Sequence, residues 1–129
     1  MGPLQTTALQ VQENGMEEMK TKAIKQKGRR FQQQVVEMII ANTGIEPSQI
    51  RSTPMGQLGP DIQMTKAARE LFPFSIECKA GGQMQEPYRA LEQAEGHQNG
   101  TPVVFAKADY QPQIVIMYAA DWFKMLSSN

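Results

Sequence analysis

Residues 74–80 read Phe-Ser-Ile-Glu-Cys-Lys-Ala, and they decide the fold that we expect for this chain. Successive side chains of a β-strand point to opposite faces of a sheet, so Glu77 and Lys79 share one face. Ile76 and Cys78 share the other face, where they can anchor the strand to an apolar core. The pattern therefore predicts a strand that holds a carboxylate and an amine side by side.

A second segment, Gly59-Pro60-Asp61-Ile62, is expected to bring another carboxylate to the same place. Asp61 opens the neighbouring strand, from which its side chain can approach Glu77. Two carboxylates on adjacent strands form an oxygen-rich site that suits Mg²⁺ or Mn²⁺, which prefer carboxylate, carbonyl and water ligands. Such a metal polarises a phosphoryl oxygen and helps to deprotonate a bound water. Lys79 can orient that water or stabilise the charge that develops on the phosphate.

A purely structural interpretation of these residues stays open. Glu77 and Lys79 can form a same-face ion pair, and Asp61 can merely end a turn. A Glu-x-Lys tripeptide is frequent by chance, so its weight comes from the combination of features. These are the Gly-Pro-Asp turn, the apolar residues on either side of Glu77, and a preceding amphipathic helix with basic residues at its start.

The remaining sequence predicts helices and strands in a regular order around these two segments. A helix is expected from Gly28 to a stop at Gly44, because apolar residues recur there at helical spacing. The other expected elements are strands at Gln49–Thr53 and Asp61–Thr65, a helical turn at Lys66–Leu71, a helix at Pro87–Glu95, a strand hairpin at Pro102–Lys107 and Gln113–Tyr118, and a closing helix capped by Asp121. The order α-β-β-β-α-β-β-α predicts an α/β fold with a central mixed sheet flanked by helices.

The charge of the chain is balanced but unevenly distributed. Thirteen Lys and Arg residues face thirteen Asp and Glu residues among 129, so the formal net charge is zero. A protein that holds nucleic acid through bulk positive charge is therefore excluded. No acidic residue occurs between Glu18 and Glu37, and one basic block lies within that stretch: Lys20, Lys22, Lys25, Lys27, Arg29 and Arg30. Such a run is most often a solvated face, but phosphate contacts need charge only where they form, so it is also a candidate phosphate-binding surface.

The residues ahead of the basic block are polar and rich in Gln, and Asn14-Gly15 is an expected break. We therefore expect residues 1–26 to form a polar and basic N-terminal arm or a helix. Residues 27–129 are expected to form a single domain of common size.

Several classes of protein are excluded by what the sequence lacks. No apolar run approaches the ~20 residues of a membrane span, and residues 1–10 lack the basic residues and apolar stretch of a secretory signal. The single cysteine, Cys78, cannot form an intramolecular disulfide and fits a reducing compartment. One cysteine and one histidine cannot build a structural zinc site of four ligands. These features predict a cytoplasmic protein without membrane contact.

Gly59-Pro60-Asp61 together with Glu77-Cys78-Lys79 resembles the PD-(D/E)XK nuclease superfamily. The segment Lys27-Gly28-Arg29-Arg30-Phe31-Gln32 resembles the Lys-Gly-x-x-x-Glu opening of archaeal-type Holliday junction resolvases. Residues 51–56 and 68–79 are similar to small phage proteins of the resolvase type. The resemblance spans residues 27–107 and implies a restriction-endonuclease-like core.

This resemblance implies metal-dependent hydrolysis of phosphodiesters in branched DNA, with Mg²⁺ or Mn²⁺ as the cofactor. Asp61, Glu77 and the backbone carbonyl of Cys78 would hold the metal, and Lys79 would be the catalytic lysine. The basic block and Arg51 would contact DNA phosphates, which position a substrate without reading its bases.

Three residues outside these two motifs enter the implied site. Ser52 lies where resolvases often place a serine near the scissile phosphate, and Gln93 is a candidate for steadying the site. Gln32 stands where the resolvase opening supplies a glutamate as a further metal ligand. A neutral amide can accept hydrogen bonds from metal-bound water but adds no charge. Three interpretations stay open: Gln32 acts through a metal-bound water, another carboxylate replaces it as a ligand, or the site binds metal weakly. We expect the first, since the helical phase of Glu37 turns that carboxylate away from the apolar side of the helix.

Two other reactive side chains have no expected role in the chemistry. His97 lies in a polar turn and is expected at the surface, without a second histidine to support a metal site. Cys78 has an apolar strand phase and is expected in the core rather than as a nucleophile.

The expected function is a structure-selective endonuclease of phage recombination or packaging, which would act in the cytoplasm of a bacterial host. Cutting two strands of a symmetric junction needs two active sites, so a two-fold homodimer is expected. Its interface candidates, which core burial explains equally well, are Tyr118, Trp122, Phe123 and Met125. The alternatives are a weak or inactive DNA-binding protein on a nuclease fold, a restriction-type nuclease that recognises a sequence, and a protein in which the Glu77–Lys79 pair is structural.

Overall fold

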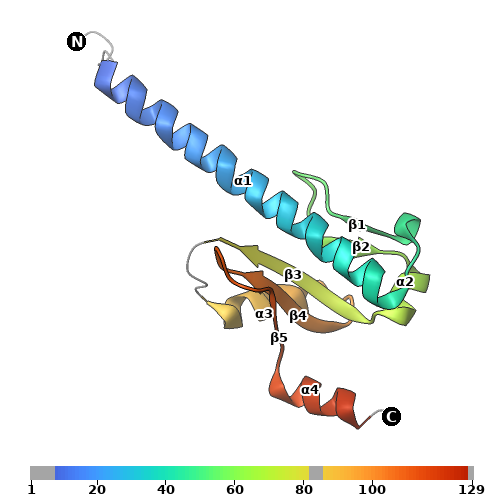
Figure 1. Cartoon of the computed structure of the whole chain (residues 1–129). Helices are drawn as coiled ribbons and strands as arrows, with labels where there is room; N and C mark the ends of the chain where they lie inside the picture. Colours follow the sequence, from blue (N-terminus) through green and yellow to red (C-terminus); the bar gives the residue numbers. More distant parts are fainter. Residues whose placement is uncertain (1–7, 82–85, 128–129) are drawn as a thin grey trace.

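The computed structural model describes residues 8–81 and 86–127; residues 1–7, 82–85 and 128–129, and the side chains of residues 8–11, lie outside the described part. The described residues form helices and strands in an α/β order (Figure 1). In chain order these are α1 Ala8–Thr43, a 3₁₀ turn η1 Pro47–Gln49, β1 Ile50–Ser52, β2 Ile62–Met64, α2 Lys66–Leu71, β3 Phe74–Ala80, α3 Pro87–Gly96, β4 Thr101–Lys107, β5 Ile114–Ile116 and α4 Ala119–Leu126. The predicted α/β class and element order are confirmed.

Helix α1 is 36 residues long, and its N-terminal half projects away from the sheets (Figure 1). It continues through Asn14-Gly15, so the break expected there is wrong, and it crosses the expected boundary between residues 26 and 27. A glycine destabilises a helix by only about 1 kcal/mol relative to alanine. The Gln, Glu, Met and Lys residues on either side have good helix propensity and offset that cost. Its apolar side chains become buried from Phe31 onward, where helical apolar spacing begins in the sequence.

The strands form two sheets rather than the one central sheet that the sequence predicts, and that prediction is wrong in this respect. β1 and β2 pair antiparallel, with Ser52 opposite Ile62. β3 pairs parallel with β4, which pairs antiparallel with β5, so the second sheet is mixed. No backbone ladder joins β2 to β3 in the described chain. We call the boundary between β2 and β3 the seam. It is bridged by a side chain, because Asp61 accepts a hydrogen bond from the backbone N–H of Cys78 at 2.8 Å.

The core lies on both faces of β3. On one face, side chains of α1 and the first sheet pack against Ile76, Cys78 and Phe105. On the other face, α3 packs its small inner side, Ala90, Leu91 and Ala94, against the sheet. β3 is thus fixed between two helices, and its alternating side chains have two different environments.

The C-terminal helix α4 is set apart from this core. It begins at Ala119, two residues before the expected cap at Asp121, and none of its eight residues is buried. In Figure 1 it lies beyond β5, on the side of the second sheet away from α1. No helix of the described residues is long and apolar enough to cross a membrane.

Candidate active site

Strand β3 presents Ser75 and Glu77 on the same face, as its alternation predicts, and in the structure that face meets the C-terminal end of α3. Ser75, two residues earlier, is fully buried and donates a hydrogen bond from its hydroxyl to the carbonyl of Ala94 at 2.5 Å. This bond ties the strand to the C-terminal part of α3. Glu77 is 6% exposed, which is unusual for a carboxylate and requires polar or charged partners.

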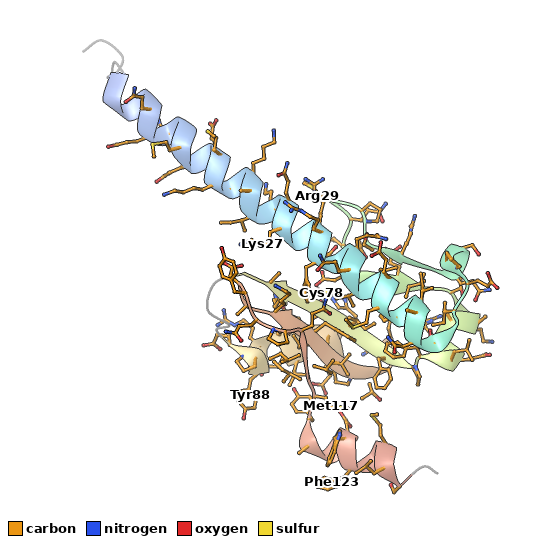
Figure 2. All side chains as sticks on the ribbon, in the orientation of Figure 1. Lys27, Arg29, Cys78, Tyr88, Met117 and Phe123 are labelled. Atoms are coloured by element: carbon orange, nitrogen blue, oxygen red, sulfur yellow. The ribbon has the colours of Figure 1, made fainter. Side chains whose placement is uncertain are left out.

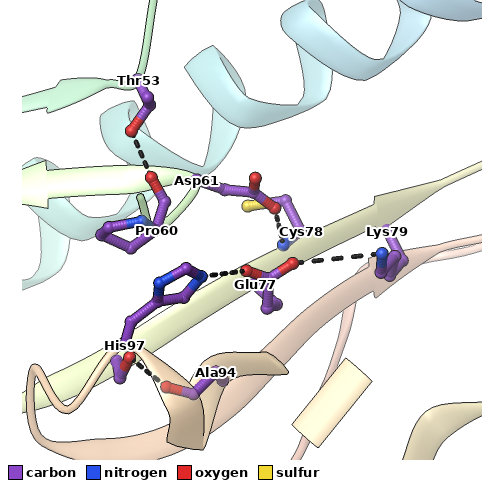
Figure 3. A network of polar contacts seen from close by, with 9 residues as sticks. Thr53, Pro60, Asp61, Glu77, Cys78, Lys79, Ala94 and His97 are labelled. Carbon is purple, nitrogen blue, oxygen red and sulfur yellow. Dashed lines mark hydrogen bonds and ion pairs between the residues drawn. The ribbon is translucent and has the colours of Figure 1, made fainter. Parts of the chain in front are cut away.

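The partners of Glu77 come from its own strand and from the end of α3 (Figure 3). The Lys79 amine lies 4.0 Å from Oε2 of Glu77, so the predicted same-face pair is confirmed as a contact. On the other side of the carboxylate, Nε2 of His97 lies 3.3 Å from Oε1. Each oxygen of Glu77 therefore faces one nitrogen group.

Asp61 reaches the same place from the start of β2. Its backbone carbonyl accepts a hydrogen bond from the N–H of Thr53 at 2.8 Å, and the Thr53 hydroxyl donates to the carbonyl of Pro60. The Gly-Pro-Asp turn is thus held by the strand that precedes it. The Asp61 side chain then spans the seam, with Oδ2 accepting from the N–H of Cys78.

The two carboxyl groups influence each other electrostatically. The pKa of Glu77 is raised from 4.5 to about 7, first by burial and then by the negative charge of Asp61 and a hydrogen bond with that side chain, whereas Lys79 lowers it. Two carboxylates this close cannot both stay ionised at low cost, since like charges favour a shared proton. A divalent cation removes the same repulsion, so the pair is suited to bind either a proton or a cation.

The backbone of Cys78 faces the seam, while its thiol lies in the core. The N–H of Gly81 bonds to the carbonyl of Lys107 on β4. Because backbone groups alternate sides along a strand, Glu77 and Lys79 also direct their N–H groups toward β4. The N–H of Cys78 points the other way, to Asp61, and its carbonyl shares that edge because both groups of a strand residue point to one side. Burial raises the pKa of the Cys78 thiol far above its usual range, as expected for a core side chain and not for a nucleophile.

His97 is the residue that sequence reasoning missed. We expected it at the surface of a polar turn, whereas its side chain is 28% exposed and contacts Glu77. His97 follows α3 directly, and its backbone N–H bonds to the carbonyl of Ala94. Ala90, Ala94 and His97 are spaced four and three residues apart, and this helical spacing on the inner side of α3 was the available signal.

The helper residues implied by the resemblance are not joined to the two carboxylates. Gln32 is half-buried on α1, and no hydrogen bond within residues 8–81 and 86–127 links it to Asp61 or Glu77. Gln93 is exposed on α3. Ser52 is half-buried at the end of β1, opposite Ile62, which places it one residue from Asp61 across the first sheet.

The basic block lies on the exposed half of α1 (Figure 2). All six of its residues are exposed, and Lys27 forms an ion pair with Asp109 at 2.9 Å. An open groove of about 570 Å³ runs beside α1, lined by Lys22, Lys25 and Arg29, by acidic residues of the preceding turns, and by Met55 of the β1–β2 loop. Arg51 is exposed on β1, where its Nε donates to Gln63 at 3.0 Å. β1 packs beside α1 (Figure 1).

A cation at this site would have few protein ligands. No group of three or more His, Cys, Asp and Glu side chains among the described residues is arranged to hold a metal ion. The available donors are the carboxylates of Asp61 and Glu77 and the carbonyl of Cys78. That set suits Mg²⁺, which commonly binds through one or two carboxylates and keeps several of its waters.

Comparison with protein-family models, with curated proteins and with solved structures finds no match to this chain. The resemblance to the nuclease superfamily therefore rests on the sequence motifs alone.

Proposed function

We propose that this chain is a metal-dependent endonuclease that hydrolyses phosphodiesters in branched DNA. The observation that supports the proposal most is the convergence of Asp61 from β2 and Glu77 from β3 at a seam where no strand pairing intervenes. Burial and mutual repulsion disfavour two ionised carboxylates there. A bound Mg²⁺ or Mn²⁺ would satisfy both.

The donors of this chain fit such a cation. Asp61, Glu77 and the carbonyl of Cys78 would hold it, with water completing the shell. When bound, the cation supplies Lewis-acid polarisation of a phosphate and a more acidic water.

Two side chains around Glu77 have distinct tasks in the proposal. The Lys79 amine is about half exposed beside Glu77, so it can also reach a phosphate oxygen from solvent. It would stabilise the negative charge that develops on the phosphate. His97 holds the other oxygen of Glu77 and would fix the orientation of that carboxylate.

The basic half of α1 is the proposed DNA-binding surface. Its lysines and arginines are exposed on a helix that projects from the core, so they can follow a phosphate backbone, with Lys27 exchanging its ion pair with Asp109 for a phosphate. Contacts of this kind are independent of base sequence and depend on salt. They suit recognition of shape, and a homodimer would place two such helices and two sites on one junction.

The test is a cleavage assay with purified full-length chain. A four-way junction, a flap and a linear duplex are each incubated with Mg²⁺ or with EDTA. We expect cutting of the junction in Mg²⁺ alone, with a loss of at least ~100-fold in Asp61→Asn, Glu77→Gln and Lys79→Ala. Glu37→Gln and Lys66→Ala remove exposed charges of the same kinds elsewhere and should cut like the wild type.

Two results would contradict the proposal. Equal cutting by wild type and by the three site variants would exclude the site, since the activity would then come from elsewhere or from a contaminant. Cutting of the linear duplex alone at a fixed sequence would favour a restriction-type nuclease.

A non-catalytic DNA-binding protein is the second candidate, and one observation favours it. Both oxygens of Glu77 already face nitrogen groups of the chain, and one oxygen of Asp61 is bonded to a backbone amide. With Gln32 in place of a third carboxylate, the site is held together without a metal. Junction binding without cleavage in Mg²⁺ and in Mn²⁺ would support this candidate.

A further inference from the structure

The C-terminal part of the described chain exposes a cluster of large apolar side chains. Trp122, Phe123, Met125 and Leu126 of α4, with Ile114 and Val115 of β5, are each between 44% and 63% exposed. The two elements are separated by only two residues, and we call their exposed side chains together the C-terminal apolar surface; Ile114 and Val115 are consecutive on β5, so they flank its outer edge from opposite faces of the sheet. Figure 2 shows Phe123 on the outer side of α4.

Helix α4 is apolar over most of its circumference. Only Asp121 and Lys124 are charged among its eight residues, and they lie close together on one narrow side. A helix that is apolar nearly all round is normally buried. Here none of its residues is buried, and α4 packs closely against no other element of the described chain.

Strand β5 adds an unpaired edge to this surface. It pairs with β4 on one side, and its other edge meets no strand of the part that the structure describes. The strand reads Ile-Val-Ile and contains no charge and no proline, which are the usual protections of an edge. Such an edge accepts another strand through backbone hydrogen bonds.

We propose that a second copy of this chain covers the C-terminal apolar surface. Six apolar side chains that are half exposed present on the order of 600 Å² per copy, close to the ~800 Å² per partner of a standard interface and at the upper limit for a patch on a monomer. A two-fold axis beside β5 places the two β5 edges antiparallel, and each α4 then packs on the partner. The surface is self-complementary, since α4 carries one acid and one base and two copies do not repel.

This association does not depend on the proposed nuclease activity. Helix α4 lies beyond β5 on the side of the second sheet away from α1, so a dimer formed through it leaves the basic helices exposed (Figure 1). If the chain is also a nuclease, the same dimer carries two sites.

The experiment measures mass and tryptophan emission of the full chain without DNA or metal. Trp122 is the single tryptophan, so its emission reports on α4 directly. We expect twice the chain mass by light scattering at high concentration, and a shift of the emission to longer wavelength as dilution yields monomers. Phe123→Ser should weaken association roughly 30-fold, as truncation of a central aromatic side chain does at an interface.

A matched control separates this surface from general stickiness. Leu58→Ser removes an apolar side chain that is 99% exposed in the β1–β2 loop, and it should leave the dissociation constant unchanged. Circular dichroism checks that both variants keep the wild-type fold, which we expect because Phe123 and Leu58 lie outside the core. A chain that stays monomeric at every concentration, or a dimer that Phe123→Ser and Leu58→Ser weaken equally, would overturn the proposal.

Discussion

Replacing Glu77 by glutamine should make the stability of this protein less dependent on pH. Glutamine has the shape of a protonated glutamate but cannot ionise. In the folded chain the pKa of Glu77 is raised from 4.5 to about 7, chiefly by burial and then by Asp61. At about 1.4 kcal/mol for each pKa unit, the ionised form costs the fold about 3 kcal/mol.

The direction of the pH dependence follows from which state, folded or unfolded, binds the Glu77 proton more tightly. Between pH 4.5 and about 7 the folded chain binds this proton and the unfolded chain has lost it. The free energy of unfolding therefore falls as pH rises through this window, because the folded state binds more protons. The stabilisation is fully present below pH 4.5 and is lost above pH 7. A loss of about 3 kcal/mol is large beside the roughly 5–15 kcal/mol of a typical domain.

The assay is urea denaturation of wild type and Glu77→Gln at several pH values from 4.5 to 8. Other ionisable groups are common to both proteins, so the informative quantity is the difference in unfolding free energy between wild type and variant. We expect the variant to gain about 3 kcal/mol relative to wild type across this range. Glu37→Gln, which removes an exposed carboxylate of α1, should show a difference close to zero at every pH.

A cation should act on the same quantity. Above pH 7, Mg²⁺ at ten times its dissociation constant should stabilise wild type by about 1.4 kcal/mol and leave Glu77→Gln nearly unchanged. A difference between wild type and Glu77→Gln that is flat in pH would refute the electrostatic coupling inferred for the site. A gain of the variant that shrinks as pH rises would refute it as well.

Three further predictions concern α1, a glycine and a buried hydroxyl. A triple variant of α1 carries Lys20→Gln, Lys22→Gln and Lys25→Gln. It should bind a labelled four-way junction more weakly, as measured by fluorescence anisotropy, and the slope of log affinity against log salt should fall by about one for each phosphate that it no longer neutralises. Lys66→Gln should change neither the affinity nor the slope. Gly100→Ala should destabilise the fold by about 2 kcal/mol or more in urea, since φ is +131° and the new Cβ would lie 2.4 Å from the carbonyl oxygen of Pro73. Gly56→Ala, with φ of +82° but open space around it, should cost only about 1 kcal/mol. Ser75→Ala should cost about 1 kcal/mol, because it removes the hydrogen bond to α3 but the accepting carbonyl keeps a second donor.

Each of these predictions has a contradicting result. An unchanged salt slope would show that the lysines of α1 do not contact phosphates. Equal costs for the two glycine variants would show that the close approach of the backbone at Gly100 is relieved elsewhere. No change in Ser75→Ala would mean that the hydroxyl contributes nothing beyond its bond to water in the unfolded chain.

The central strand and its neighbours could be predicted because their patterns are local. Alternation along Phe74–Ala80 places Glu77 and Lys79 on one face, and the structure has them in contact. The Gly-Pro-Asp turn likewise places Asp61 at the start of β2, where it reaches β3. Period and turn chemistry are properties of short segments, so they can be found without knowledge of the tertiary fold.

The separation of the two sheets could not be predicted in this way. The sequence pattern does not say whether β2 pairs with β3; among the described residues no backbone ladder joins them, and the carboxylate of Asp61 bonds to the N–H of Cys78 across the seam. The same limit applies to His97, whose contact with Glu77 exists only after α3 has packed on the second sheet. Both features are set by tertiary packing.

The length of α1 was mispredicted for a different reason. Apolar spacing identifies only the part of a helix that packs on a core, and here that part begins near Phe31. The exposed half has no such pattern, and its helical state comes from residues of good helix propensity. Helix α4 shows the converse, because its apolar residues predict burial that the single chain does not provide.

The proposed function requires Asp61 and Glu77 to share a divalent cation. The crystal structure of the protein soaked with Mn²⁺ tests that requirement directly. Anomalous scattering identifies manganese independently of water. We expect one anomalous peak between the two carboxylates, within bonding distance of both and of the carbonyl of Cys78, and no peak there in Glu77→Gln. A map without a peak, in which Asp61 still accepts from the N–H of Cys78 and Glu77 still lies between Lys79 and His97, would rule the shared cation out.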